Sequence, residues 1–543
     1  MPKTNFKTWL ISNRLVNSPV WKGIYALSSL TLLAFLFYNH YQIASTPYPI
    51  DYFESAMPAI TKTIMQGNNP YQFSQLPEFT DPYPPLYNLI AAPLTSVFSN
   101  DLPLHRSLAG IFIIASCLIC FLVTLRAGSS KTHSLAAATT LYACLLFFST
   151  PLASTNSTGL FFFLLTTFIP WRYNFSKSSL IVSVLCGVLA FYGKQYFILG
   201  LAFVSLYLFI AVSKKTAIIY GISSGFVVAF SLVIVVATSP YYLDVTVFLL
   251  KSGSALTFHP IRTMINQMKF FGEIYVSLII AVCLIFQANR IIQPATTKND
   301  NAVTSRDIIN IKDFDAPLLT QKPNFFLLCF IGSTLAVVLA LGWNGGNYMS
   351  YLFQLMSPFL LIFVFVTISK SKAPLLIVLP FLLFFSYKTY SILNKDFSID
   401  EKPWKQVEAL IESHESILGS PILTAMLMKH DKKLYHNSLT FFFHLANEKP
   451  EIFIRDDKEL RTTTIWKNYL SRLSQKIENK EFDLLLLSSG DARGMFYTNP
   501  DEIPGIEYLQ KYYRQGEVLK VSLTKKRGGG KHKIIVWTPK ESD

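Results

Sequence analysis

An acidic residue follows the first long apolar stretch of the sequence. Asp51 stands a few residues past the apolar segment 23–41, in Thr-Pro-Tyr-Pro-Ile-Asp-Tyr. A carboxylate at the mouth of a membrane-spanning helix can accept a proton from an attacking hydroxyl or hold a metal ion. Glu54 would share a face with Asp51 if this segment is helical. We therefore predict that both are catalytic carboxylates, with a solvated acidic loop as the alternative.

Three basic residues could bind an anion. Lys194 interrupts two apolar runs, where a lysine either anchors a helix at the membrane surface or binds an anionic group. His259 and Arg262 stand together in His-Pro-Ile-Arg, which is compact enough for one phosphate. We predict that all three bind a phosphate; ordinary surface positions are the alternative.

Aromatic and amide side chains near the same boundaries could bind a sugar. Aromatic faces beside amide groups hold sugars by stacking and hydrogen bonding, although an aromatic belt at the membrane surface would explain the rings equally well. Asn156 matches a glycosylation sequon, but this pattern is frequent by chance and predicts nothing here. The predicted sugar or acceptor contacts are Tyr83, Gln195, Asn347 and Tyr348.

The elements that must position these residues are membrane helices. Of the 543 residues, 51% are hydrophobic and 15% are charged, whereas soluble proteins carry about 25% charged residues. The net charge of +15 lies mainly in short loops beside apolar runs, which indicates the cytoplasmic side of a membrane and not a nucleic-acid surface. All six cysteines fall in apolar runs, so the sequence predicts neither a disulfide framework nor a zinc site.

Hydropathy and basic loops together predict about eleven membrane-spanning helices. The apolar segment 84–99 is assigned to a juxtamembrane helix, because a further crossing would move Arg126 and Lys131 to the opposite side. The predicted spans are 23–41, 105–125, 134–149, 157–170, 179–193, 197–212, 217–238, 273–287, 325–341, 350–368 and 373–390.

These spans predict a mainly α polytopic membrane protein with a small C-terminal α/β domain. Residues 1–22 would be cytoplasmic, 23–390 would form the transmembrane domain with a first outer loop at 43–103, and 391–543 would lie outside. In the last segment we predict a helix at 404–417. Strands are predicted at 421–427, 483–487, 517–524 and 532–538, and the last two would form a hairpin.

The outer segments resemble those of the GT-C superfamily of membrane glycosyltransferases, in the branch of the protein O-mannosyltransferases and aminoarabinose transferases. Asp51 matches an aspartate of the first outer loop, and Tyr83-Pro84-Pro85-Leu86 is similar to a motif that opens a juxtamembrane helix. Segments 105–108, 191–195 and 348–358 are looser matches, and the resemblance covers most of the first 390 residues.

Two departures from the family pattern affect the expected site. Asn156 stands where the family often has a second acidic residue, which puts a two-carboxylate metal site in doubt. Tyr83 replaces a usual His or Lys, which shifts phosphate binding to Lys194 or Arg262. The resemblance implies no certain cofactor, and a divalent metal ion could take part.

The resemblance implies a polyprenyl-phosphate sugar donor that is used at the outer face of the membrane. The expected location of the protein is the inner membrane of a bacterium. Asp51 would act as the base in an inverting transfer to a hydroxyl of a glycan, lipid or protein acceptor, with membrane lipid as the surrounding partner. Phosphate is a good leaving group, so cations on the departing phosphate matter more than a general acid. A polysaccharide polymerase or ligase, a lipid or solute transporter and a non-enzymatic sensor are the alternatives.

Overall fold

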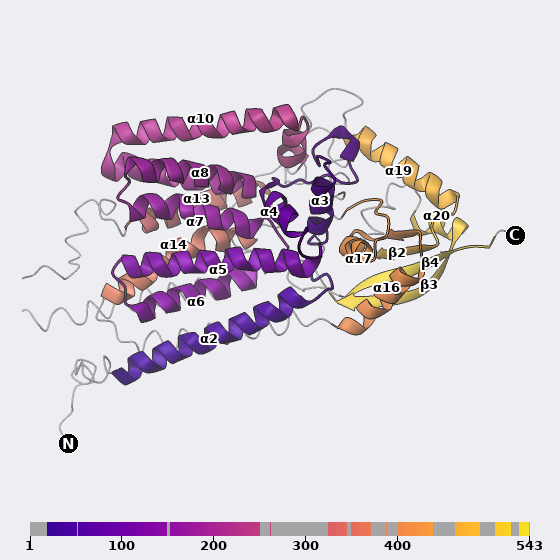
Figure 1. The fold of residues 1–543 in the computed structure, drawn as a ribbon, viewed down its shortest axis with the longest axis horizontal. Coiled ribbons are helices and arrows are strands. Elements are labelled where there is room, and N and C mark those ends of the chain that lie inside the picture. Colours follow the sequence, from indigo (N-terminus) through magenta and orange to yellow (C-terminus); the bar gives the residue numbers. More distant parts are fainter. Residues whose placement is uncertain are drawn as a thin grey trace, which may run out of the picture.

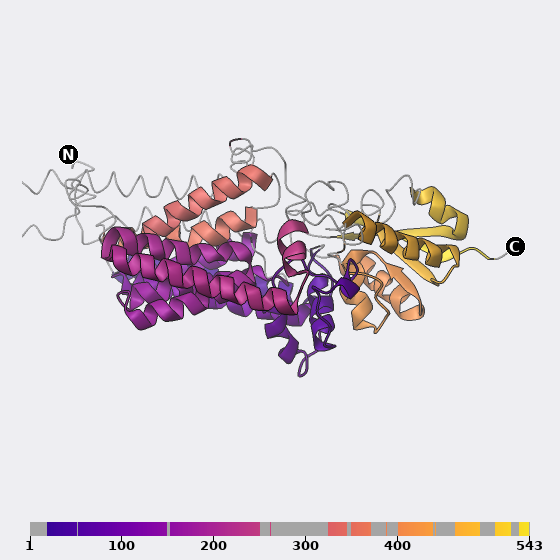
Figure 2. The same ribbon diagram turned by 90° about the horizontal axis from the view of Figure 1, so that it is seen from above.

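The computed structural model describes a helical bundle joined to an α/β unit (Figure 1). The described residues are 19–51, 53–148, 153–249, 324–344, 349–370, 400–437, 462–488, 505–522 and 531–541, together with the single residues 261, 387 and 440. In the two perpendicular views, the bundle lies toward one end of the molecule and the α/β unit toward the other (Figure 2).

Long apolar segments form the helices of the bundle. Asp101 begins the second long helix by accepting a hydrogen bond from the Leu104 amide (3.0 Å), a capping interaction that its sequence position supplies. The bundle helices are α2 (Pro19–Ser45), α5 (Leu102–Arg126), α6 (Lys131–Phe148), α7 (Asn156–Arg172), α8 (Lys177–Gly193), α9 (Leu199–Tyr207), α10 (Lys214–Thr238), α13 (Asn324–Asn344) and α14 (Met349–Lys370).

Among the described residues, three helical stretches are long and apolar enough to cross a membrane. They are Leu102–Arg126, Gln195–Val212 and Lys214–Thr238. Shorter apolar helices occur at Lys177–Gly193, Phe325–Val337 and Gln354–Val366. The count of about eleven spans therefore stays a prediction. The predicted spans 273–287 and 373–390 lie outside the described residues, except for Tyr387.

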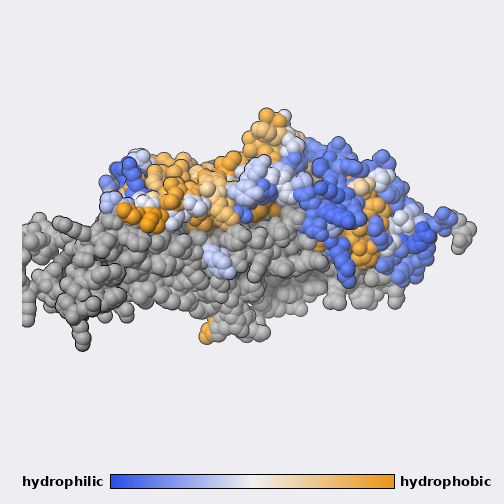
Figure 3. Space-filling view, turned by 90° about the horizontal axis from the view of Figure 1, so that it is seen from below, coloured by the Kyte–Doolittle hydropathy of each residue, from blue (hydrophilic) through white to orange (hydrophobic). Residues whose placement is uncertain are grey.

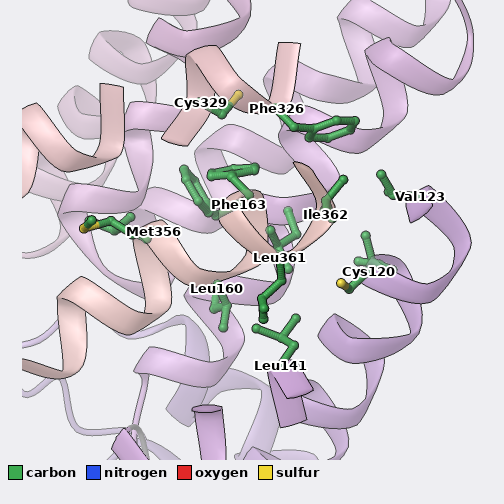
Figure 4. Packing of buried hydrophobic residues seen from close by; sticks show 14 of the residues in the cluster. Cys120, Val123, Leu141, Leu160, Phe163, Phe326, Cys329, Met356, Leu361 and Ile362 are labelled. Atoms are coloured by element: carbon green, nitrogen blue, oxygen red, sulfur yellow. The ribbon is translucent and has the colours of Figure 1, made fainter. Parts of the chain in front are cut away.

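Apolar side chains fill the space between the bundle helices. Phe163 of α7 packs against Phe359 of α14 with ring centroids 5.5 Å apart, and Phe326 of α13 belongs to the same buried cluster (Figure 4). The described cysteines are buried and reduced, and Cys120 and Cys329 lie within this cluster. Figure 3 shows hydrophobic surface over the bundle and mainly hydrophilic surface over the α/β unit, as expected for a membrane-embedded bundle with a water-exposed appendage.

The first outer loop covers the end of the bundle that faces the α/β unit (Figure 1). It contains α3 (Ala56–Met65), a short 3-10 turn (Phe73–Gln75) and α4 (Leu86–Leu94). With nine residues, α4 is about 14 Å long and cannot cross a hydrocarbon core of about 30 Å. Leu89, Val97 and Phe98 are exposed apolar side chains on or just after α4, which suits a helix at a membrane surface.

The α/β unit is built on a four-stranded sheet with the order β1-β2-β4-β3. β1 pairs with β2 in parallel, and the other two pairings are antiparallel. Its elements are α16 (Glu401–Ser413), β1 (Ile417–Gly419), α17 (Thr424–Lys429), α19 (Thr462–Glu478), β2 (Leu484–Ser488), α20 (Gly505–Tyr512), β3 (Tyr513–Ser522) and β4 (Lys531–Pro539).

Most of the elements expected in this unit are present, with one correction. The β3–β4 hairpin and the strand at 483–487 are confirmed, and the helix predicted at 404–417 is α16. The strand predicted at 421–427 is wrong, because this segment forms a 3-10 turn and α17, while the strand is Ile417–Gly419. A short apolar run does not distinguish a buried strand from a buried helical turn.

Candidate active site

A buried ion pair organises the segment that carries Asp51. The guanidinium of Arg106, on α5, donates to both carboxylate oxygens of Glu54, and neither side chain is more than 1% exposed. Arg106 also donates to three backbone carbonyls at the end of α2 and just after it: those of Ile43 (3.3 Å), Thr46 and Tyr48 (2.7 Å). One rigid, five-donor side chain therefore fixes the path of the backbone into the loop.

Glu54 completes this arrangement from the other direction. Its Oε1 accepts a hydrogen bond from the Ile50 amide (2.5 Å) and a longer one from the Asp51 amide (3.4 Å). Both its charge and its acceptor positions are therefore engaged in shaping the loop. We propose Glu54 as a positioning residue for Asp51, in place of the second catalytic carboxylate expected from the sequence.

Asp51 lies in the irregular backbone between α2 and α3, and only 3% of the residue is exposed. Its Oδ1 accepts a hydrogen bond from the Phe53 amide (3.0 Å), which fixes one oxygen relative to the main chain. A carboxylate held in this way is oriented by its own turn and not by a flexible surface loop. This geometry suits a residue that must accept a proton in one direction.

Lys194 is buried where the end of α8 meets the first outer loop. Its Nζ donates to Oδ1 of Asn156 (2.6 Å) at the start of α7, and lies 4.5 Å from the ring centroid of Tyr83. The ring of Tyr196 lies somewhat further away, at 5.8 Å. The aromatic faces and the amide oxygen stabilise a cation whose residue is only 6% exposed. The structure therefore brings the predicted residues Lys194 and Tyr83 together.

Asp81 adds a carboxyl group to this cluster. It is completely buried, its Oδ1 accepts from the Tyr83 amide (2.9 Å), and its Oδ2 accepts from the Asn88 side chain (3.0 Å). Burial raises the pKa of Asp81 to about 7, although these hydrogen bonds and the charge of Lys194 act in the opposite direction. Near neutral pH this carboxyl therefore exists in both protonated and ionised forms.

Two glycines allow α7 and α8 to approach at this point. A Cβ atom on Gly193 would lie 2.6 Å from Cα of Gly159, which is too close for any side chain. A Cβ on Gly159 would lie 2.4 Å from the ring of Phe197 and 3.2 Å from the backbone nitrogen of Lys194. The close crossing places the start of α7, with Asn156, beside the residue that follows α8.

The remaining predicted residues fall into two groups. Gln195 donates from Nε2 to the Thr246 carbonyl (3.0 Å), so its amide helps to hold the short π-helical segment Asp244–Leu249. Gln195 follows Lys194 in the sequence, but its hydrogen bond joins two parts of the backbone and does not point to a ligand. Four predicted site residues lie outside the described part of the chain: His259, Arg262, Asn347 and Tyr348.

Hydrogen bonds tie the loop to the ends of the bundle helices. Tyr71 donates from its hydroxyl to the Tyr83 carbonyl (2.6 Å), and its ring packs edge-on against Tyr242. The Asn69 side chain donates to Ser239 (2.7 Å) and to the Thr238 carbonyl (3.1 Å) at the end of α10. These bonds therefore fasten the loop to the end of α10 and to the backbone of Tyr83, whose ring contacts Lys194.

One group of described residues has the composition of a metal site. Ligand atoms of Glu408, Glu412 and His430 lie within 4.8 Å of one another on the α/β unit. Two other side chains already engage Glu408, because Lys429 Nζ lies 2.5 Å from its Oε1 and the Tyr48 hydroxyl donates to its Oε2 (3.0 Å). These contacts make the group an ion-pair cluster that joins the α/β unit to the loop.

Sequence reasoning missed three residues of this site. Arg106 was noted only as part of a loose motif match, although a charged residue near the start of an apolar helix usually has a buried partner. The sequence predicts no role for Asp81, and it indicates Asn156 only as a chance sequon and as a departure from the family pattern. Only the folded chain shows that Asp81 and Asn156 meet at Lys194.

No protein-family model matches the sequence, and no curated protein matches it. Among solved structures, the chain is similar to ArnT from Cupriavidus metallidurans in the apo state. The identity is 10% and the TM-score is 0.38, with 93% of this chain and 97% of that chain covered. The structure of ArnT from the same organism bound to undecaprenyl phosphate gives 9% identity and a TM-score of 0.37, covering 94% and 97%. At this level of identity and superposition, the likeness carries no argument about the chemistry of this chain. Any proposal about its chemistry must rest on its own residues.

Proposed function

We propose that this protein is a membrane glycosyltransferase that moves a sugar from a polyprenyl-phosphate donor to a hydroxyl acceptor at the outer face of the membrane. The observation that carries the proposal is the buried lysine at the end of the bundle. Lys194 contacts Asn156 and Tyr83, and its charge interacts with the carboxyl of Asp81, a residue of the same loop as Asp51. A cation at this depth suits the phosphate of a lipid held in the membrane.

In this proposal Asp51 accepts the proton of the acceptor hydroxyl. The hydroxyl oxygen then forms a bond to the anomeric carbon of the donor, and the bond from that carbon to the phosphate oxygen breaks. The electron pair leaves with the polyprenyl phosphate, and Lys194 stabilises the additional negative charge. Attack opposite to the departing phosphate inverts the anomeric centre. Arg262 and His259 are proposed as further phosphate contacts.

Asp81 makes the lysine available to the donor. A carboxyl group with a pKa of about 7 is partly protonated near neutral pH, and in its protonated form it does not offset the positive charge that Lys194 presents to an incoming phosphate. Tyr83, whose ring contacts this lysine, and Gln195, which follows it in the sequence, are proposed to contact the sugar or the acceptor, as are Asn347 and Tyr348. The acceptor is proposed to be a glycan, lipid or protein of the cell envelope.

The test is transfer by the purified full-length protein in lipid nanodiscs, supplied with short-chain polyprenyl-phosphate sugars as donors. Asp51→Asn should lower kcat by about 10²–10⁴, the usual contribution of a positioned base, while the protein stays folded. Asp51→Glu should retain part of the activity. Unchanged transfer by Asp51→Asn would show that Asp51 is not the base. Deleting the gene and finding no accumulated polyprenyl-phosphate sugar would oppose the proposed donor.

A fusion tests the proposed sidedness. The basic residues Arg126, Arg172 and Lys214 lie at the ends of α5, α7 and α10 that are opposite to the ends near the first outer loop, and the positive-inside rule places such ends in the cytoplasm. Alkaline phosphatase fused after Asp543 should therefore be active, because that enzyme works outside the cytoplasm. An inactive fusion with full expression would reverse the orientation.

A further inference from the structure

The α/β unit contacts the first outer loop on both sides of Asp51. Before it, the ring of Tyr48 stacks on Trp404 of α16, with centroids 6.0 Å apart and an interplanar angle of 9°. The Tyr48 hydroxyl donates to Glu408 of the same helix (3.0 Å). After it, the Ser55 hydroxyl donates to the Ile422 carbonyl (2.7 Å), just before α17. The irregular segment with Asp51 therefore has an anchor on the α/β unit at each end.

A second contact lies directly before Asp81. The backbone amide of Asn437 donates to the Glu78 carbonyl (2.9 Å), and its side-chain Nδ2 donates to the Thr80 carbonyl (3.0 Å). Asn437 and Thr80 are both completely buried. Glu78 also forms an ion pair with Arg472 of α19. These bonds determine where the backbone enters the turn that presents Asp81 and Tyr83.

The residue before Asn437 holds this contact firmly within the α/β unit. His436 Nε2 lies 3.0 Å from the Gly419 carbonyl of β1, and its Nδ1 lies 3.0 Å from the Tyr469 hydroxyl of α19. Burial lowers the pKa of His436 to about 4, so the ring is neutral at neutral pH. A neutral ring with a donor at Nε2 and an acceptor at Nδ1 satisfies both bonds. Asn437 is thus attached to the sheet and to α19.

We propose that the α/β unit is a positioning element for the candidate active site, and that Asn437, Trp404 and Arg472 act through the loop on Asp51 and Asp81. Both carboxyl groups lie in irregular backbone between helices, so its position depends on contacts with other parts of the chain as well as on its own turns. A displacement of about 1 Å can lower a rate by about 10² when a reacting group must be aligned. The consequence for transfer rests on the proposed function, whereas the anchoring of the loop does not.

The test measures hydrogen exchange of the loop and the rate of sugar transfer in the same full-length variants. Asn437→Asp keeps the oxygen that accepts from the Thr440 amide (3.2 Å) and removes the donor to Thr80. We expect faster hydrogen exchange in residues 76–85, with unchanged exchange in α5 and α7. We also expect kcat to fall by about tenfold or more, and KM for the polyprenyl-phosphate sugar to change as well, because the loosened turn carries Asp81 and Tyr83.

A charge reversal tests the same anchor by rescue. Glu78→Arg and Arg472→Glu should each increase exchange in residues 76–85 and lower kcat, and the double variant should restore most of both. Lys476→Glu is the matched control, because it breaks the Lys476–Glu481 pair of α19 inside the α/β unit. That control should alter neither exchange in residues 76–85 nor kcat.

Two results would overturn the proposal. One is a hydrogen-exchange rate in residues 76–85 that equals the wild-type rate in all three single variants, Asn437→Asp, Glu78→Arg and Arg472→Glu. The other is a loss of kcat in the single reversals that the double variant fails to restore although exchange recovers. If the wild-type protein transfers no sugar, that result counts against the proposed function, while hydrogen exchange still decides whether the α/β unit anchors the loop.

Discussion

The Nζ atom of Lys194 donates a hydrogen bond of 2.6 Å to Oδ1 of Asn156, which joins the end of α8 to the start of α7. These residues are 38 positions apart in the sequence, and neither residue type alone indicates the contact. Their meeting places a cation, an amide and the ring of Tyr83 at one point of the bundle end. The expected effects of substitution at this point follow from that geometry.

Substitution of Asn156 should change donor binding more than folding. Asn156→Asp places a carboxylate next to the lysine, and this carboxylate would compete with a donor phosphate for its charge. We expect KM for the donor to rise about tenfold or more, which corresponds to about 1.4 kcal/mol. Lys194→Gln should lower kcat/KM by about 10²–10³. Lys62→Gln, on α3, is the control and should behave like the wild type.

An unchanged KM for the donor in Asn156→Asp would contradict a role of Lys194 in binding the donor phosphate. Steady-state kinetics with varied donor concentration measure this directly. Thermal unfolding of the same samples shows whether the variant is folded.

The close approach of α7 and α8 should be sensitive to a single methyl group. Gly193→Ala would place a Cβ against the backbone of Gly159, and neither helix can yield without moving its neighbours. Overpacking of this kind costs about 1–3 kcal/mol. Gly225→Ala in α10 is the matched control, because nothing lies within 4 Å of the added atom. Thermal unfolding in detergent should show a lower Tm for Gly193→Ala and an unchanged or higher Tm for Gly225→Ala.

The buried pair of Arg106 and Glu54 should be required for folding of the loop. Glu54→Gln leaves a guanidinium buried without its counter-charge, and removal of one partner from a buried pair costs about 3–5 kcal/mol. We expect a large fall in Tm and faster proteolysis of the loop. Lys405→Gln breaks the exposed Lys405–Glu401 pair and should change Tm little. Equal Tm values for the two variants would contradict a structural role for Glu54.

Donor binding should depend on pH through Asp81. The charged or titratable groups that act on this carboxyl are Lys194, Tyr71 and Tyr242. Burial raises the pKa of both tyrosines, so they stay neutral near pH 7. As pH rises through about 7, Asp81 loses its proton and its charge then offsets that of Lys194. KM for the donor should therefore rise across this range.

Removing the carboxylate should remove this dependence. In Asp81→Asn, KM should rise much less than in the wild type between about pH 6 and 8, because the donor is a phosphodiester whose charge does not change there and His259 is then the other group of the proposed site that titrates in this range. A pH profile of KM for both proteins checks this. The same rise of KM with pH in both proteins would exclude Asp81 as its source.

Periodicity and hydropathy were sufficient for the parts of the fold that depend on local sequence. The apolar runs at 105–125 and 217–238 predicted α5 and α10, because a membrane-spanning helix satisfies its backbone hydrogen bonds within one segment. The β3–β4 hairpin was predictable for a similar reason, since its strands are neighbours in the chain. By contrast, the run at 421–427 was too short to show its period.

Residue type and placement also singled out Asp51, Lys194 and Tyr83, but they could not reveal what these residues contact. Only the tertiary structure decided that Arg106 pairs with Glu54, that Asp81 and Asn156 gather at Lys194, and that Asn437 anchors the loop. These contacts join residues between 38 and 357 positions apart in the chain. Their geometry depends on how whole helices cross and on how the α/β unit packs, which no local pattern of residues encodes.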